Sequence, residues 1–375
     1  MRIAQVAPLY ESVPPKYYGG TERVVSYLTE ELVRQGHEVT LFASGDSITQ
    51  ARLIAPCSQS LRLNQTCIDH IAHHIVMLEQ VAQRASHFDI IHFHIDYLHF
   101  PLSRRHTTPQ VTTLHGRLDL PDLIPLYQEF CDMPVVSISD AQRQPLPWIN
   151  WQGTIYHGLP EHLYTFCDQP GTYLAFMGRI APEKRVDRAI EIAKQLDMPL
   201  KIAAKVDAID QEYFVSVVQP LLRHPLVEYV GEIGEGDKDG FLGHARALLF
   251  PIDWPEPFGL VMIEAMACGT PVIAYRRGSV SEVIDEGVTG FIVDTLEEAV
   301  RAVENVASLS RQRCREVFQE RFSAARMAHD HVTVYRHLVE ARPVTVSTLQ
   351  TSLLPVNVSP IDLDAHLWQG SPIER

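Results

Sequence analysis

Short apolar runs with the length of β-strands alternate with helix-like stretches, and this alternation constrains the fold more than any other feature of the sequence. In the first part of the chain the strand-like runs lie at residues 3–8, 38–43, 89–94, 110–114, 135–139 and 153–156. Strands that are separated by helices usually join one parallel sheet that helices cover on both faces. The alternation therefore predicts an α/β fold.

The same pattern begins again after the polar stretch at residues 167–171. Its strand-like runs lie at residues 173–177, 200–204, 227–230, 247–250 and 271–274. A chain of 375 residues is also longer than one hydrophobic core usually grows. We therefore expect two domains, residues 1–165 and 166–342, with a last helix that could return to the first domain. Residues 343–375 contain prolines and serines without a sustained period, and we expect a loosely packed or disordered tail.

A glycine pair and an amphipathic helix follow the first strand. The helix is predicted over residues 21–35 by apolar side chains at helical spacing, namely Val24, Val25, Leu28 and Leu32. Gly19 and Gly20 precede it, where bare backbone can approach a pyrophosphate. Glycine pairs in loops are more often simple turns, but the position directly after the first strand favours ligand binding here.

Two cations lie between a strand and a helix in the second half of the chain. The segment FMGRIAPEKR places Gly178 and Arg179 after a strand and Lys184 at the start of an amphipathic helix. Two cations on such a turn can neutralise the charge that grows on a departing nucleotide diphosphate. The alternative is an exposed basic turn, and we favour the diphosphate clamp.

Two glutamates lie in the segment PEPFGLVMIEAMACG, where seven residues separate Glu256 from Glu264. The prolines predict a loop around Glu256, and a helix is predicted over residues 258–268. The loop is expected to become a helix at Phe258, Gly259, Leu260 and Val261. The backbone amides of this first helical turn can attract phosphate. Glu264, about two turns into the helix, can accept hydrogen bonds from ribose hydroxyls.

Histidines lie at the ends of two predicted strands. In VTTLHG, His115 lies just beyond the carboxyl end of a strand, where open α/β sheets bind ligands. In HFHIDYLHF, His92, His94 and Asp96 are spaced two apart and share one face of a strand, so a metal site is an alternative there. We do not expect that metal site.

Together these segments resemble the retaining glycosyltransferases of family 4, also called glycosyl transferases group 1. The glutamate segment is similar to their E-x7-E signature, FMGRIAPEKR to their G-R-x-x-x-E-K clamp, and YYGGTERVV to their glycine loop. The resemblance covers most of residues 1–340 and implies a GT-B fold, in which two Rossmann-like doubly wound parallel-sheet domains face a cleft.

The resemblance also implies an activity and a set of site residues. The reaction would move a hexose from a nucleotide-diphosphate sugar, of the UDP-glucose or GDP-mannose type, to an acceptor hydroxyl, with retention and without a metal or other cofactor. The implied catalytic residues are Glu256, His115, Arg179 and Lys184. The implied donor contacts are Gly19, Gly20, Arg179, Lys184, Phe258, Gly259, Leu260, Val261 and Glu264, with Glu232 and Ile233 near the base.

Two rival functions remain open on this fold. One is an isomerase similar to nucleotide-sugar 2-epimerases, and the other is a non-catalytic nucleotide-sugar binding protein. The sequence identifies neither the donor base nor the acceptor, which could be a sugar, a small molecule or a lipid-linked compound. The oligomeric state is also open.

Other patterns and the charge exclude some functions. Asp237 and Asp239 imitate a metal-binding D-x-D, but they enter a predicted helix, where carboxylates are ordinary capping residues. The nearby glycines do not have the spacing of a dinucleotide fingerprint, and the six cysteines lack zinc-ligand spacing. The net charge of −14 argues against nucleic acid as a partner and allows peripheral membrane contact at most. The N-terminal residues lack a secretory signal, so we expect a cytoplasmic protein.

Overall fold

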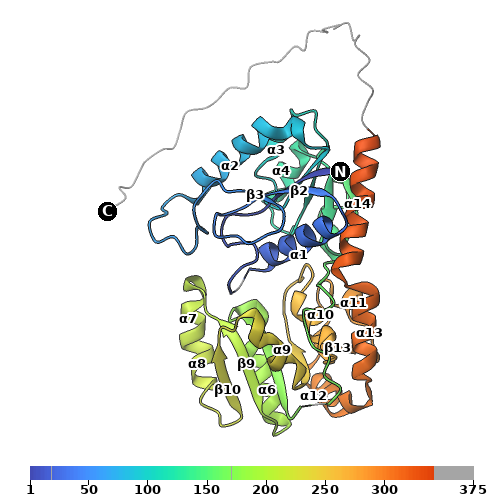
Figure 1. Cartoon of the computed structure of the whole chain (residues 1–375). Coiled ribbons are helices and arrows are strands. Elements are labelled where there is room, and N and C mark those ends of the chain that lie inside the picture. The colour runs from blue at the N-terminus through green and yellow to red at the C-terminus, as the bar shows by residue number, and fades with distance from the viewer. Residues whose placement is uncertain (18, 170, 342–375) are drawn as a thin grey trace, which may run out of the picture. The chain divides into compact units, whose positions relative to one another are not determined.

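The computed structural model describes residues 1–17, 19–169 and 171–341, and two parallel sheets organise them (Figure 1). The tail predicted at residues 343–375 lies outside the described residues. The predicted α/β fold with two doubly wound parallel sheets is confirmed. We call the part built on β1–β7 the N-terminal lobe and the part built on β8–β13 the C-terminal lobe.

The N-terminal lobe contains a seven-stranded sheet with the order β3-β2-β1-β4-β5-β6-β7. Its strands are β1 (Arg2–Val6), β2 (Glu38–Phe42), β3 (Arg52–Ile54), β4 (Ile90–Phe93), β5 (Gln110–Thr113), β6 (Val135–Ser137) and β7 (Trp151–Thr154). The strand order reverses at β1, which pairs in parallel with both β2 and β4. Open α/β sheets bind ligands beyond the carboxyl ends of the strands at such a reversal.

The C-terminal lobe contains a six-stranded sheet with the order β10-β9-β8-β11-β12-β13. Its strands are β8 (Tyr173–Arg179), β9 (Leu200–Lys205), β10 (Val227–Gly231), β11 (Ala245–Phe250), β12 (Val272–Tyr275) and β13 (Gly290–Val293). Here the order reverses between β8 and β11, which are also parallel neighbours. Each lobe therefore offers one ligand-binding edge.

Helices connect the strands and cover the sheets. The α-helices are α1 (Gly20–Arg34), α2 (His70–Arg84), α3 (Phe100–Ser103), α4 (Leu123–Glu129), α5 (Asp140–Arg143), α6 (Val186–Gln195), α7 (Gln211–Tyr213), α8 (Gln219–Leu221), α9 (Glu235–Gly243), α10 (Leu260–Ala267), α11 (Val280–Val283), α12 (Leu296–Asn305), α13 (Arg311–Arg321) and α14 (Ala324–Glu340). Shorter helical turns lie at Ala85–His87, Pro182–Lys184, Ala208–Asp210, Phe214–Val218 and Val306–Ser308. Among the described residues, none of these helices is both long enough and apolar enough to cross a bilayer.

Adjacent residues of β4 illustrate how both faces of the first sheet are covered. Ile90 belongs to the same core as Leu28 of α1, whereas Ile91 belongs to the core that contains Met77 of α2. Successive strand side chains point to opposite faces, so α1 and α2 cover different faces. Each such side chain contributes about 1.5–3 kcal/mol when it is fully buried.

The last helix, α14, lies beside α1 of the N-terminal lobe (Figure 1). Its Tyr335 is fully buried and forms hydrogen bonds with Gln5 of β1 and His92 of β4. The chain therefore leaves the C-terminal lobe through α13 and ends its described part against the first sheet.

Several boundaries differ from those predicted. The strands β3 and β13 were not predicted, because each is a short run at the edge of its sheet. Arg179 is the last residue of β8 and does not lie in the following turn. The helix predicted from Phe258 begins at Leu260, because Gly259 has a φ of 79°, which is incompatible with a right-handed helix.

Candidate active site

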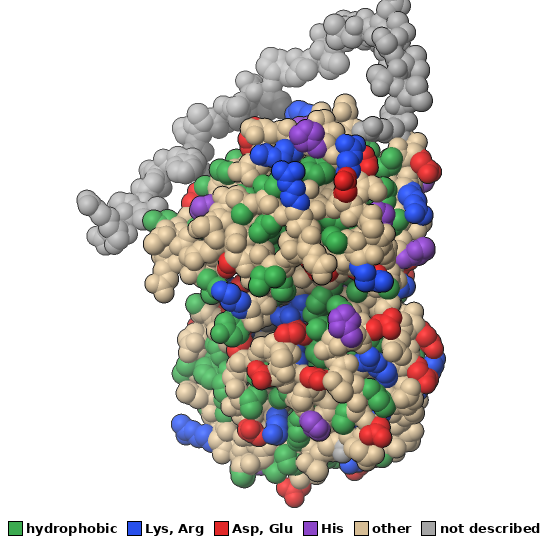
Figure 2. Space-filling model, viewed as in Figure 1, with side chains coloured by type: hydrophobic (Ala, Val, Ile, Leu, Met, Phe, Trp, Pro, Cys, Tyr) green, Lys and Arg blue, Asp and Glu red, His purple; other side chains and the backbone are tan. Residues whose placement is uncertain are grey.

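A cavity of about 490 Å³ is lined by residues of both lobes. Figure 2 shows a recess between the lobes in which basic side chains are visible. All of the predicted catalytic and donor-binding residues line this cavity: Gly19, Gly20, His115, Arg179, Lys184, Glu256, Phe258, Gly259, Leu260, Val261 and Glu264. Glu232 and Ile233 line it as well. The structure thus brings together residues that lie far apart in the sequence.

Two helix N-termini approach each other at the cavity. Gly20 is the first residue of α1, and a side chain added there would come within 3.6 Å of Leu260, the first residue of α10. At Gly259, just before α10, an added Cβ would lie 2.9 Å from Met262 Cε and 3.0 Å from Phe250 Cζ, so these side chains would have to shift, and the φ of 79° also favours glycine. The first amides of a helix lack intrahelical partners and carry partial positive charge, so this region can bind an anion.

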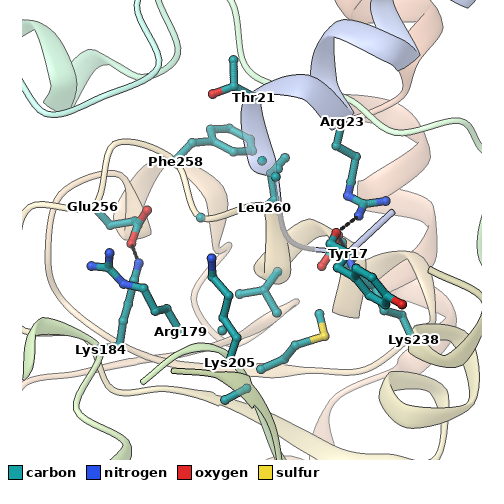
Figure 3. Close-up of a pocket in the computed structure, with 18 of the residues that line it drawn as sticks. Tyr17, Thr21, Arg23, Arg179, Lys184, Lys205, Lys238, Glu256, Phe258 and Leu260 are labelled. Carbon is teal, nitrogen blue, oxygen red and sulfur yellow. Dashed lines mark hydrogen bonds and ion pairs between the residues drawn. The ribbon is translucent and has the colours of Figure 1, made fainter. Parts of the chain in front are cut away.

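Glu256 is held in the loop before α10 by two side chains. Its carboxylate accepts hydrogen bonds from the ammonium of Lys184 and from the indole N–H of Trp254, the latter at 2.9 Å. The ammonium of Lys184 also lies 4.9 Å from the centre of the Trp254 ring, a favourable cation–π position. Figure 3 shows Lys184 and Glu256 pointing toward one another beside Arg179. A cation and a carboxylate are therefore fixed side by side at one end of the cavity.

Arg179 has a basic neighbour that was not predicted as a site residue. The last residues of β8 and β9, Arg179 and Lys205, are paired in register, and both line the cavity. Asp207 lies 3.7 Å from the guanidinium of Arg179 and 2.9 Å from the ammonium of Lys205. Figure 3 shows Lys205 between two groups of basic side chains, one formed by Lys184 and Arg179 and the other by Arg23 and Lys238. Lys205 was missed because β9 was predicted to end at Ala204.

Lys238 of this second group contacts Glu264. The carboxylate of Glu264 is buried and lies 2.7 Å from the ammonium of Lys238, while the hydroxyl of Tyr164 donates to it at 3.3 Å. Burial lowers the pKa of Lys238, and the nearby Glu264 opposes that change. Glu264 is therefore an oriented acceptor at this end of the cavity.

The structure separates the roles of Asp237, Lys238 and Asp239, which follow one another in the sequence. Lys238, the central residue of the three, lines the cavity. Asp239 accepts a hydrogen bond from the backbone N–H of Thr165 at 2.8 Å and caps no helix, whereas Asp237 lies in the first turn of α9. The capping interpretation is thus wrong for Asp239, because the loop at Thr165 packs against α9. Sequence spacing gave no signal for this contact.

His115 lies at the N-terminal side of the cavity and is a neutral imidazole. Burial lowers its pKa to about 3, its ring stacks on that of His157 at 5.3 Å, and its Nε2 lies 2.9 Å from Nδ1 of His94. The segment with His92, His94 and Asp96 does not present one strand face, because Asp96 has a φ of 49°. Within residues 1–17, 19–169 and 171–341, no group of three or more His, Cys, Asp or Glu side chains is arranged to hold a metal ion.

Two models of known protein families match the chain. The model described as "Glycosyl transferases group 1" matches residues 167–323, and the model described as "Glycosyltransferase Family 4" matches residues 18–151. The two matches together include most of both lobes and all of the predicted site residues that line the cavity.

Two curated relatives illustrate the extent of the similarity. The N-acetyl-alpha-D-glucosaminyl L-malate synthase of Bacillus anthracis is 26% identical over an alignment of 361 residues, which covers 84% of this chain and 93% of that protein. An uncharacterized 41.2 kDa protein in the cps region of Klebsiella pneumoniae is 28% identical over 170 residues. That match covers 44% of this chain and 46% of the Klebsiella protein, so the chain spans less than half the length of this relative.

Solved structures have the same arrangement of elements. Anabaena HepE in complex with UDP and glucose superimposes with a TM-score of 0.69 at 17% identity, over 90% of this chain and 100% of that chain. A sucrose-phosphate synthase from Thermosynechococcus elongatus superimposes with a TM-score of 0.74 at 19% identity, over 91% of this chain and 100% of that chain. At these identities the likeness concerns the fold.

Proposed function

This chain belongs to the glycosyl transferases of group 1 and family 4 and has the GT-B fold. We propose that it moves a hexose from a nucleotide-diphosphate sugar to an acceptor hydroxyl. The reaction would retain the anomeric configuration of the sugar and would need no metal ion. As a glycosyltransferase it needs a donor, and the structures of Anabaena HepE with UDP and with UDP-glucose support a nucleotide sugar. Both UDP-glucose and GDP-mannose types are candidates.

The observation that carries the proposal is the pair formed by Lys184 and Glu256, beside Arg179 and two helix N-termini. When the bond from sugar to diphosphate breaks, negative charge grows on the leaving group. Fixed cations and backbone amides stabilise that charge without reorganisation. Arg179 and Lys184 would bind the diphosphate and do the work that a metal ion does in other transferases, and the amides near Gly20 would add to it.

Glu256 would act on the sugar. Its carboxylate would lie near the reacting carbon and stabilise oxocarbenium-like positive charge, while Phe258 and Gly259 shape the same loop. The leaving phosphate would accept the proton of the acceptor hydroxyl on the same face of the sugar, so the configuration is retained. Closure of the lobes would exclude water and protect the donor from hydrolysis.

Glu264 would bind the ribose, and Glu232 and Ile233 would lie near the base. Glu264 suits this role because Lys238 and Tyr164 orient its carboxylate inside the cavity. The acceptor would be a sugar, a small molecule or a lipid-linked compound that enters from the N-terminal lobe.

The first test is calorimetry with UDP, GDP, ADP and their common sugars, with magnesium or with a chelator. We expect one nucleotide to bind equally well in both conditions and the Lys184→Ala variant to lose that binding. Lys194→Ala, which removes an exposed lysine paired with Glu191, is the matched control. Binding that requires magnesium would contradict metal independence.

The second test is NMR of the product formed with the bound donor and a panel of acceptors. We expect a new glycosidic bond with the anomeric configuration of the donor. An inverted anomer would contradict retention. An epimerised nucleotide sugar would instead identify an isomerase, and unchanged donor with every acceptor would identify a binding protein.

A further inference from the structure

Buried histidines lie behind His115, and the proposed mechanism does not use them. His92 lies in β4 and His94 directly follows the last residue of that strand; their ring centres are 4.0 Å apart, and both side chains are buried. Burial lowers the pKa of both well below the ordinary value for histidine. They are neutral, so each has one donor nitrogen and one acceptor nitrogen.

A continuous series of hydrogen bonds connects these rings to the cavity. We call it the histidine chain, and its members in order are His115, His94, Gln5, Tyr335, His92 and Thr113. The His115 Nε2 to His94 Nδ1 distance is 2.9 Å, and His94 Nε2 to Gln5 Oε1 is 2.8 Å. The amide of Gln5 donates to the Tyr335 hydroxyl at 3.1 Å. His92 Nδ1 lies 2.6 Å from that hydroxyl, and its Nε2 lies 2.7 Å from Thr113 Oγ1.

The amide of Gln5 sets the direction of every proton in this series. Its Oε1 faces His94 and can only accept, so His94 carries its proton on Nε2. Nδ1 of His94 is then unprotonated and accepts from His115. Since His115 is neutral and uses Nε2–H for that bond, its Nδ1 has no proton. Among the described residues, this Nδ1 has no hydrogen-bond partner.

The far side of Gln5 agrees with this direction. Its Nε2 donates to the Tyr335 hydroxyl, which leaves the hydroxyl proton for Nδ1 of His92. His92 then donates from Nε2 to Thr113. Each hydrogen bond of the histidine chain thus joins one donor to one acceptor, and in none of them do two protons face each other.

We infer that the histidine chain fixes the tautomer of His115, so that a bare Nδ1 meets the ligand as a hydrogen-bond acceptor. His94 and Gln5 are positioning residues, because they act through His115. The identity of the ligand rests on the proposed function. A bare nitrogen attracts the hydrogen of a sugar hydroxyl and repels a phosphate oxygen, so His115 recognises a hydroxyl of the donor sugar and does not support the leaving phosphate.

The direct test is long-range proton–nitrogen NMR of the full chain labelled with nitrogen-15 in histidine, without ligand at neutral pH. Protonated and bare imidazole nitrogens have well separated shifts, and the His115 signals are assigned by their loss in His115→Ala. We expect a protonated Nε2 and a bare Nδ1. A protonated Nδ1 in the wild-type protein overturns the inference, whatever the variants do.

Two variants of Gln5 test whether the histidine chain is the cause. Gln5→Met keeps the length but removes the acceptor, and we expect His115 to become a mixture of tautomers. Gln5→Glu keeps an acceptor toward His94, and we expect the wild-type tautomer. A His115 spectrum that Gln5→Met leaves unchanged would contradict the role of Gln5.

The ligand is tested separately with donor analogues in which one sugar hydroxyl at a time is replaced by fluorine, which cannot donate. One analogue should bind the wild type about two- to tenfold more weakly than the parent donor, the range of one hydrogen bond. The His115→Ala variant should bind the same analogue as tightly as it binds the parent donor. If no nucleotide sugar binds, the proposed function fails while the NMR result still decides the tautomer. If all analogues lose affinity equally in both proteins, the hydroxyl contact is wrong.

Discussion

The guanidinium of Arg23 and the carboxylate of Glu235 form an ion pair that joins the two lobes. Arg23 lies on α1, where its side chain is only 5% exposed, and Glu235 is the first residue of α9. Glu235 also accepts a hydrogen bond from Tyr164 and lies 3.6 Å from Lys238. Because Lys238 and Tyr164 also contact Glu264, the contact between the lobes is connected to a carboxylate inside the cavity.

We predict that Arg23→Gln weakens nucleotide binding about tenfold, because the carboxylate of Glu235 loses its partner in the other lobe and the lobes are held together less well. Calorimetry with the preferred nucleotide measures the change. Arg34→Gln is the matched control, since Arg34 lies on the same helix and pairs with Glu31 at the exposed surface. Equal affinities for Arg23→Gln and Arg34→Gln would contradict the prediction.

Lys184→Gln and Glu256→Gln should each lower kcat about 100-fold, because each removes a charge that the transition state needs. The double variant should be little worse than either single variant, since the two side chains form one pair. Single-turnover rates with saturating donor measure both effects. Turnover within a few fold of wild type in either single variant would refute the assigned roles.

Lys205→Met should weaken binding of the nucleoside diphosphate about tenfold and leave binding of the nucleoside nearly unchanged. The reason is that Lys205 lies beside Arg179 in register and adds charge next to the diphosphate. Lys201→Met is the control, because Lys201 lies on the same strand but pairs with Glu228. An equal loss for nucleoside and diphosphate would show that Lys205 acts on folding or on the base.

Glu22 should make stability depend on pH. Burial raises its pKa from 4.5 to about 7, and the nearby carboxylate of Glu11 acts in the same direction. A raised pKa means that the folded protein prefers the protonated form. The stabilisation is therefore complete below pH 4.5 and is lost as the pH rises through about 7, by about 3 kcal/mol at most.

Urea unfolding of the wild type and of Glu22→Gln at pH 5 and at pH 8 tests this prediction. The glutamine variant lacks the titration, so its stability relative to wild type should be greater at pH 8 than at pH 5. Other titrating groups are common to both proteins and cancel in the comparison. A difference that is the same at both pH values would show that Glu22 does not titrate in this range.

The sequence predicted the two sheets and a set of residues that line one cavity, but it did not predict the contacts that these side chains make. Pro255, Pro257 and Gly259 are local signals, and the loop and helix that they predicted are present, with the helix starting two residues later. Lys238 lies between two aspartates that were interpreted as capping residues and was given no role of its own, although it contacts Glu264. That contact joins residues 26 positions apart, and no local period carries it.

The sequence by itself determined the alternation of strands and helices, the glycines before α1 and α10, and the order of charged groups along the chain. These follow from side-chain periodicity and from backbone angles, which depend on near neighbours only. Only the tertiary structure decided that Arg23 pairs with Glu235, that Lys205 lies beside Arg179, and that Gln5 meets Tyr335 across 330 positions. Hydrogen bonds and ion pairs act over a few ångströms, so they depend on how the sheets and lobes pack.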